Sequence, residues 1–262
     1  MQTKYVYDET VSGKGTDQIN SMLQHFIRTT ILPSGKKKLV VYADNCSGQN
    51  KNNLVIMFLL AQVQMGLFER VDYTFFVKGH TKNSCERGFG HIRKHVGRQD
   101  LWTMDQVVAA VTASAVSNAT VHSSRGDDFF MHYKPLVTEL YKNLSGVQQF
   151  QIFTMESSKP GVVQCRKGPD SEVEEQDLRR KIDGVLTEAS KVERMFAHFR
   201  VPVRPHVFRS HKEARRCRYN GKADATRAQS CNGSGCKEAS GPVRTGRRRR
   251  SHSLGEHEAQ DV

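Results

Sequence analysis

Residues 39–53 read LVVYADNCSGQNKNN, an apolar run of strand length that ends in a carboxylate and a series of amides. Residues 73–90, YTFFVKGHTKNSCERGFG, repeat this order, with a second apolar run before a polar stretch. Open α/β sheets bind their ligands at the carboxyl ends of the strands. The two stretches therefore predict a polar site at one sheet edge, with Asp44 and Glu86 as its carboxylates.

Strands and helices alternate along the chain, which is typical of an α/β domain with parallel strand pairs. The run Leu39–Ala43 has the character of a buried strand, and Leu54–Met65 is apolar nearly all round, as in a helix covered by a sheet. Thr16 or Asp17 is expected to cap the first helix. We expect further strands at residues 5–7, 71–77, 149–155 and 162–165, and further helices at residues 19–27, 84–94, 105–116, 134–144 and 172–199.

The composition indicates a globular domain with a basic character. The 262 residues are 37% apolar and 8% aromatic, enough for one substantial core. Forty Lys and Arg against 27 Asp and Glu give a net charge of +13, which favours polyanions such as nucleic acid. Charge alone does not choose between DNA, RNA and an anionic membrane.

The composition changes from Pro205 onward. Residues 205–262 contain 13 Lys and Arg against 6 Asp and Glu, a net charge of +7, and few large apolar residues. Such a segment cannot offset the entropy of ordering, so we expect it to be disordered. We therefore divide the chain into a domain at residues 1–167, a charged amphipathic helical extension at 168–204 and a disordered basic tail at 205–262.

Neither a membrane span nor a secretory signal is expected. The sequence has no run of 18 apolar residues, and Met1–Lys4 leads into no signal-like stretch. Its six cysteines do not form the framework of a small secreted protein, so we expect reduced thiols. These features predict a nuclear or cytosolic protein without a membrane partner. The cluster Arg247–Arg250 favours the nucleus, unless it is simply part of a solvated tail.

The two polar stretches resemble those of a eukaryotic transposon-derived family, a domain of unknown function with an RNase H-like fold of the integrase or transposase type. The resemblance covers roughly residues 4–167 and rests on Asp44–Asn52 (DNCSGQNKN), Gly79–Thr81 (GHT) and Cys85–Gly90 (CERGFG). It implies an ancestral Mg²⁺-dependent transposase or nuclease. Asp44 is then the second acidic position, and Glu86 stands where the third is usually Asp. The expected fold is α/β, a mixed RNase H-like sheet flanked by helices.

The residue types suit two-metal chemistry on a phosphodiester. Asp44 and Glu86 offer the oxygen ligands that Mg²⁺ prefers, with Mn²⁺ as an alternative, and His80 is suited to positioning a water or protonating a leaving group. Neighbouring amides and cations are suited to phosphate contacts, on DNA in preference to RNA. The predicted nucleic acid contacts are Asn45, Gln49, Asn50, Lys51, Lys82, Arg87, Arg247, Arg248, Arg249 and Arg250.

One part of the RNase H-like pattern is missing. That fold begins with a three-strand meander whose first strand carries the first catalytic Asp, whereas here only Tyr5–Tyr7 precedes the first helix. Tyr5–Tyr7 then corresponds to the third strand, as expected of a truncated gene, a decayed element or a piece completed by another polypeptide. With two carboxylates we expect weak or no activity from the chain alone. Asp8 is an alternative source of the missing carboxylate.

Other interpretations of the site stay open. Asp44 and Asn45 also suit the cap of the following helix, and Glu86 suits the first turn of any helix. The protein is then a non-catalytic DNA- or RNA-binding domain or a protein-interaction domain, and an oligomer is compatible with either function.

Zinc is the other metal for which the sequence offers suitable ligand residues. Cys46, His80, Cys85 and His91 lie near the two polar stretches, but no short Cys-x-x-Cys pair anchors them. No zinc is therefore predicted.

Overall fold

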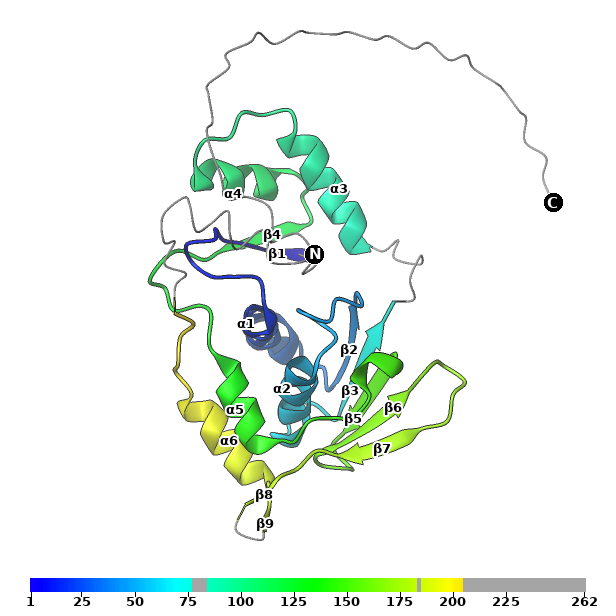
Figure 1. The fold of residues 1–262 in the computed structure, drawn as a ribbon. Helices are drawn as coiled ribbons and strands as arrows, with labels where there is room; N and C mark the ends of the chain where they lie inside the picture. The colour runs from blue at the N-terminus through cyan, green and yellow to red at the C-terminus, as the bar shows by residue number, and fades with distance from the viewer. Residues whose placement is uncertain (77–83, 183–184, 205–262) are drawn as a thin grey trace, which may run out of the picture. The chain divides into compact units, whose positions relative to one another are not determined.

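A mixed five-stranded sheet in the order β2-β3-β5-β6-β7 forms the centre of the fold in the computed structural model of the chain (Figure 1). β2 and β3 are parallel, and every other neighbouring pair is antiparallel. Helices flank this sheet, so the α/β class predicted from the sequence is confirmed. The strands are β2 (Lys38–Ala43), β3 (Arg70–Phe75), β5 (Ile152–Glu156), β6 (Val162–Arg166) and β7 (Glu174–Asp177).

The structure describes residues 1–76, 84–182 and 185–204. All of them belong to the first of two units into which the chain divides, residues 1–210. The predicted basic tail at residues 205–262 lies outside the described residues, as do His80 and Lys82.

The described helices fall into two groups. α1, α2, α5 and α6 pack together on one face of the main sheet, whereas α3 contacts α4, and α4 contacts the strand β4 (Figure 1). None of the described helices is long and apolar enough to cross a membrane. Their bounds are α1 (Thr16–Phe26), α2 (Asn53–Gln64), α3 (Ser84–Val96), α4 (Met104–Ala113), α5 (Tyr133–Leu140) and α6 (Ala189–His198).

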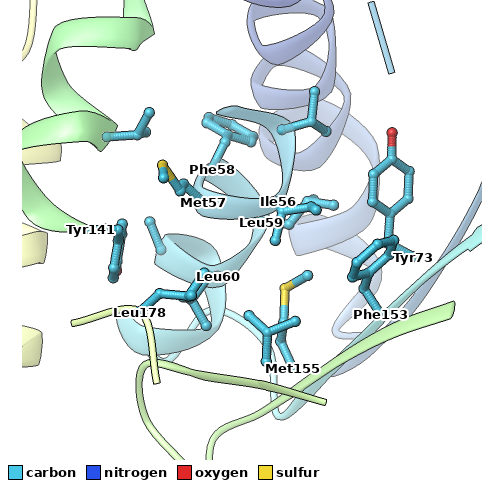
Figure 2. Close-up of a cluster of buried hydrophobic side chains, with 14 of the residues drawn as sticks. Ile56, Met57, Phe58, Leu59, Leu60, Tyr73, Tyr141, Phe153, Met155 and Leu178 are labelled. Carbon is cyan, nitrogen blue, oxygen red and sulfur yellow. The ribbon is translucent and has the colours of Figure 1, made fainter. Parts of the chain in front are cut away.

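α2 is the centre of the hydrophobic core. All of its residues from Val55 to Gln64 are buried, because β3 and β5 contact one side and α1, α5 and α6 contact the rest. Figure 2 shows Ile56 and Leu59 on the side of α2 that faces Tyr73 and Phe153 of the sheet. The prediction of an apolar helix covered by the sheet is confirmed, and Gly66 ends it with a positive φ of 73°.

The expectation of a buried strand at residues 39–43 is wrong. β2 is the edge of the sheet, and its side chains alternate between partly buried and exposed. Leu39, Val41 and Ala43 pack against the core, while Val40 and Tyr42 are 51% and 62% exposed. The reason is that no described helix covers the second face of the sheet at β2 (Figure 1).

The C-terminal half of the sheet was predicted in part. The expected hairpin is present as β5 and β6, which pair in antiparallel register. The expected helix at residues 172–199 is wrong in its first half, where Glu174–Asp177 is the strand β7 and pairs with β6. A two-stranded ribbon, β8 (Lys181–Ile182) and β9 (Val185–Leu186), follows, and only α6 is helical. The region predicted as a helical extension therefore supplies a strand to the main sheet.

The first strand does not join the main sheet. β1 (Gln2–Val6) pairs in parallel with β4 (Asn118–His122) in a separate two-stranded sheet. The expected place of Tyr5–Tyr7, as the third strand of an RNase H-like sheet, is thus not the observed one. The backbone N–H and C=O groups of a strand need partners, and those of β1 find them on β4.

The predicted cap of α1 also needs correction. The N-cap is Gly15, whose N–H donates to the side-chain oxygen of Gln18 over 2.8 Å. Asp17 instead bonds His132, with 2.6 Å between Oδ2 and Nδ1, and accepts from the Lys134 N–H over 3.0 Å. Asp17 therefore ties α1 to the start of α5 and is not available as a cap.

Candidate functional site

Asp44 lies immediately after β2, at the carboxyl end of the parallel pair β2 and β3. Its side chain is exposed and accepts a hydrogen bond from the side-chain amide of Asn50. Asn45, also exposed, donates from Nδ2 to the carbonyl oxygen of Phe76 over 2.7 Å, which ties the loop to the end of β3. The predicted carboxylate is therefore held in place at the predicted sheet edge.

The loop that carries Asp44 is closed by its own backbone. The carbonyl oxygen of Cys46 accepts from the N–H groups of Gln49, Asn50 and Lys51, at 3.3, 2.8 and 3.0 Å. The buried Tyr73 of β3 donates its hydroxyl to the carbonyl oxygen of Asn50 over 2.9 Å. Burial, and then the nearby Asp44 carboxylate, raise the pKa of Tyr73 above its ordinary value.

The N-cap of α2 is Asn52, not Asp44 or Asn45. Its side-chain oxygen accepts from the N–H groups of Leu54 and Val55 at 3.0 and 3.2 Å. Its amide group donates to the Thr16 hydroxyl at 3.0 Å and to loop carbonyl oxygens. Asp44 is thus not needed as a helix cap, which leaves its carboxylate available for another role.

Lys51 was predicted to contact nucleic acid, and the structure gives it a different place. The residue is 4% exposed, and its ammonium donates to the carbonyl oxygen of Gln148 over 3.2 Å. The same ammonium lies over the ring of Phe75, 5.3 Å from its centroid. Burial lowers the pKa of Lys51. Its charge anchors the loop to the segment before β5 and does not reach the surface.

Gln49 lines a cavity of about 600 Å³ together with residues of the loop that precedes α1. Asp8 also lines this cavity, but its Oδ1 accepts from the N–H and the hydroxyl of Thr10, at 2.7 and 2.5 Å. These hydrogen bonds from Thr10 lower the pKa of Asp8. Asp8 therefore organises a tight turn, and Gln49 is the residue of the polar loop that lines the same cavity.

Glu86 and Arg87 lie in the first turn of α3 and are exposed. The segment 77–83, which joins β3 to α3 and contains His80 and Lys82, lies outside the described residues. Within residues 1–76, 84–182 and 185–204, no group of three or more His, Cys, Asp or Glu side chains is placed to hold a metal ion. The two predicted carboxylates come from separate elements, Asp44 from the end of β2 and Glu86 from the first turn of α3.

A basic cluster on α3 was not predicted as a site. His91, Lys94, His95 and Arg98 line a cavity of about 290 Å³, with Gly90 and with Ser114 from the end of α4. His91, Lys94 and His95 share one face of α3 by their spacing of three and four residues, and Arg98 lies in the turn that follows the helix. That periodicity was present in the sequence, and counting cations along the face would have found it.

The comparisons with known proteins identify one family. The domain of unknown function DUF7869 matches residues 5–172, a range that includes both polar stretches and ends shortly before β7. No curated protein and no solved structure matches the chain.

Proposed function

Because this chain belongs to the DUF7869 family, a domain of unknown function, we propose its function from its own residues: it is a nucleic acid-binding protein of transposase ancestry. In this proposal Asp44 and Glu86 are the remaining ligands of an ancestral Mg²⁺ site. Mn²⁺ is an alternative metal, DNA is the preferred nucleic acid and the nucleus is the expected location.

The position of Asp44 is the observation that carries the proposal. An exposed carboxylate at the carboxyl end of a parallel strand pair stands where open α/β sheets bind ligands. Asn50 and the loop hydrogen bonds orient that carboxylate. Asn52, and not Asp44, caps α2. A carboxylate that is held in place but not used by the fold supports a function in binding.

The two carboxylates fit a divalent cation by their chemistry. Mg²⁺ prefers oxygen ligands and retains several waters, and a hydrated ion can replace the amide of Asn50 beside Asp44. A bound metal would supply charge to the oxygens of a phosphodiester. Two carboxylates bind the metal ion more weakly than three, so the chain alone is expected to cleave DNA weakly or not at all.

A second function, binding without catalysis, is favoured by the way the loop uses its polar residues. Lys51 is buried, Asn52 caps α2, and Asn53 bonds the backbone of Leu144 at 2.7 and 3.3 Å. These side chains preserve the loop whether or not a metal binds. In this alternative, exposed cations such as Arg87 supply the affinity for phosphates.

Metal dependence separates the two functions. The full chain is mixed with a fluorescent DNA duplex, and anisotropy is measured across a salt titration, with binding in the micromolar range expected from phosphate contacts. Nicking of supercoiled plasmid is then measured with Mg²⁺ or Mn²⁺, with Asp44→Ala as the control.

We expect salt-dependent binding and nicking close to background. Robust nicking that Asp44→Ala removes would show an active enzyme and overturn the expected inactivity. Absence of DNA binding at low salt would overturn the proposed function itself.

A further inference from the structure

The cavity between α3 and the end of α4 is lined by cationic and imidazole side chains. His91, Lys94, His95 and Arg98 all face it, and its remaining lining residues are Gly90 and Ser114. None of these six residues carries a carboxylate. The cavity therefore has a positive lining with no internal counter-charge.

The charges of this lining are not neutralised by described neighbours. Within residues 1–76, 84–182 and 185–204, the side chains of His91, Lys94 and Arg98 have no ion pair or hydrogen bond. His95 contacts the amide of Gln99, with 3.0 Å between the two nitrogens. Like charges that converge without partners repel one another, so an anion in the cavity would relieve that repulsion.

The helix dipole alone does not account for the cluster. Cations in the last turn of α3 interact favourably with its C-terminal carbonyl groups, and Lys94 and His95 lie in that turn. His91 lies more than a turn from the end of α3, and Arg98 lies beyond Val96, yet both face the same cavity. Because side chains from outside the last turn of α3 also face the cavity, the cluster indicates a binding role.

We infer that this cavity binds a phosphate group, held by Lys94 and Arg98 with His91 and His95 as further donors. Lys is a point charge for phosphate, and the planar guanidinium of Arg can donate two parallel hydrogen bonds to its oxygens. Gly90 leaves open space on its side of α3, since a Cβ there would contact nothing within 4 Å. The opening allows a phosphate that is part of a larger molecule to enter.

The phosphate has two possible sources, a nucleic acid backbone or free inorganic phosphate. The backbone source is preferred, and this preference rests on the proposed function. The cluster then adds a contact surface on α3, the helix that begins with Glu86 and Arg87. It would hold the nucleic acid in position without reading its sequence.

The test compares two double variants of the full chain with equal loss of charge. Lys94→Ala with Arg98→Ala removes the two cations of the cavity, and Lys36→Ala with Lys37→Ala removes two exposed lysines from the loop before β2. All four side chains are outside the core, and circular dichroism checks that both variants fold. DNA anisotropy across a salt titration is the first measurement, and the imidazole NMR signals of His91 and His95 during inorganic phosphate titration are the second.

The cavity variant should lose DNA affinity on the order of tenfold and reduce the salt slope by about 2, one for each phosphate contact, while the lysine control changes far less. Equal DNA affinity and slope in both double variants would refute the inference while leaving the proposed function intact. If the wild-type chain binds no DNA but inorganic phosphate shifts the signals of His91 and His95, the phosphate site stands and the proposed function fails. If neither DNA nor phosphate has an effect, both fail.

Discussion

The side-chain amide of Asn50 donates a hydrogen bond to the carboxylate of Asp44, across the loop that joins β2 to α2. The backbone carbonyl of the same Asn50 accepts from Tyr73 of β3. One residue thus connects the exposed carboxylate to the core of the sheet. The orientation of Asp44 depends on this connection.

The first prediction replaces the amide beside Asp44 by a second carboxylate. In Asn50→Asp two like charges face each other, so we expect lower stability than in Asn50→Ala, by about 0.5–1 kcal/mol at pH 7 and low salt. Because Mg²⁺ binds paired carboxylates, its addition should raise the Tm of Asn50→Asp more than that of Asn50→Ala. Thermal unfolding with and without MgCl₂ measures both effects, and equal Tm changes in the two variants would contradict the placement of a divalent cation beside Asp44.

The second prediction concerns the N-cap of α2. Asn52→Ala removes the acceptor for Leu54 and Val55 and the donor to Thr16, so we expect a loss of about 1–2 kcal/mol in the free energy of unfolding. Asn45→Ala is the matched control in the same loop, because its exposed amide makes one bond, to Phe76. Urea denaturation measures both, and a loss for Asn45→Ala as large as that for Asn52→Ala would disagree with this assignment.

Local patterns predicted the elements that depend on neighbouring residues. The apolar run of α2, the β5 and β6 hairpin and the order of strands and helices follow from spacing over a few residues. β7 was missed because its sequence, Glu-Glu-Gln-Asp, has no apolar alternation, and its charges favoured a helix. The pairing of β1 with β4 was missed because the partners lie more than 100 residues apart, and no local pattern encodes such a pairing.

The candidate site was predicted in position better than in detail. Asp44 lies at a strand end, as the sequence indicated, because the break from apolar to polar residues marks that end. The roles of Lys51 and Asn52 were not predictable, since a lysine or an amide in a loop serves equally well to bind a ligand or to hold the loop. Burial decides between these roles, and burial depends on residues distant in sequence such as Gln148.

The third prediction uses two glutamines of α2 that differ in their partners. Gln62 is fully buried, and neither polar atom of its side chain has a hydrogen bond among the described residues. Gln64 donates to the Thr187 carbonyl at 2.9 Å and accepts from the Tyr141 hydroxyl at 2.8 Å. Gln62→Leu should stabilise the protein by about 1 kcal/mol, because it removes an unpaired buried amide, while Gln64→Leu should destabilise it by about 1–3 kcal/mol.

The two substitutions are the same chemical change on one helix, so each is a control for the other. Urea denaturation of both variants gives the difference in the free energy of unfolding. A loss of stability in Gln62→Leu comparable to that in Gln64→Leu would mean that Gln62 has a partner, such as a buried water.

The fourth prediction is a pH dependence that originates at Asp72 on β3. Burial raises the pKa of Asp72, but bonds from Arg70 at 2.8 and 2.9 Å and from Thr154 at 2.7 Å outweigh it and lower the pKa overall. A carboxylate whose pKa is lower in the folded state stabilises the fold above its unfolded pKa of about 3.9, and this contribution is lost as the pH falls through the folded pKa. Asp72→Asn should therefore cost about 1 kcal/mol at pH 7, and its difference from the wild type should shrink as the pH falls below about 5. Urea denaturation across this range measures it, with the exposed Asp100→Asn as control, and a difference that stays constant with pH would show that Asp72 does not contribute through its charge.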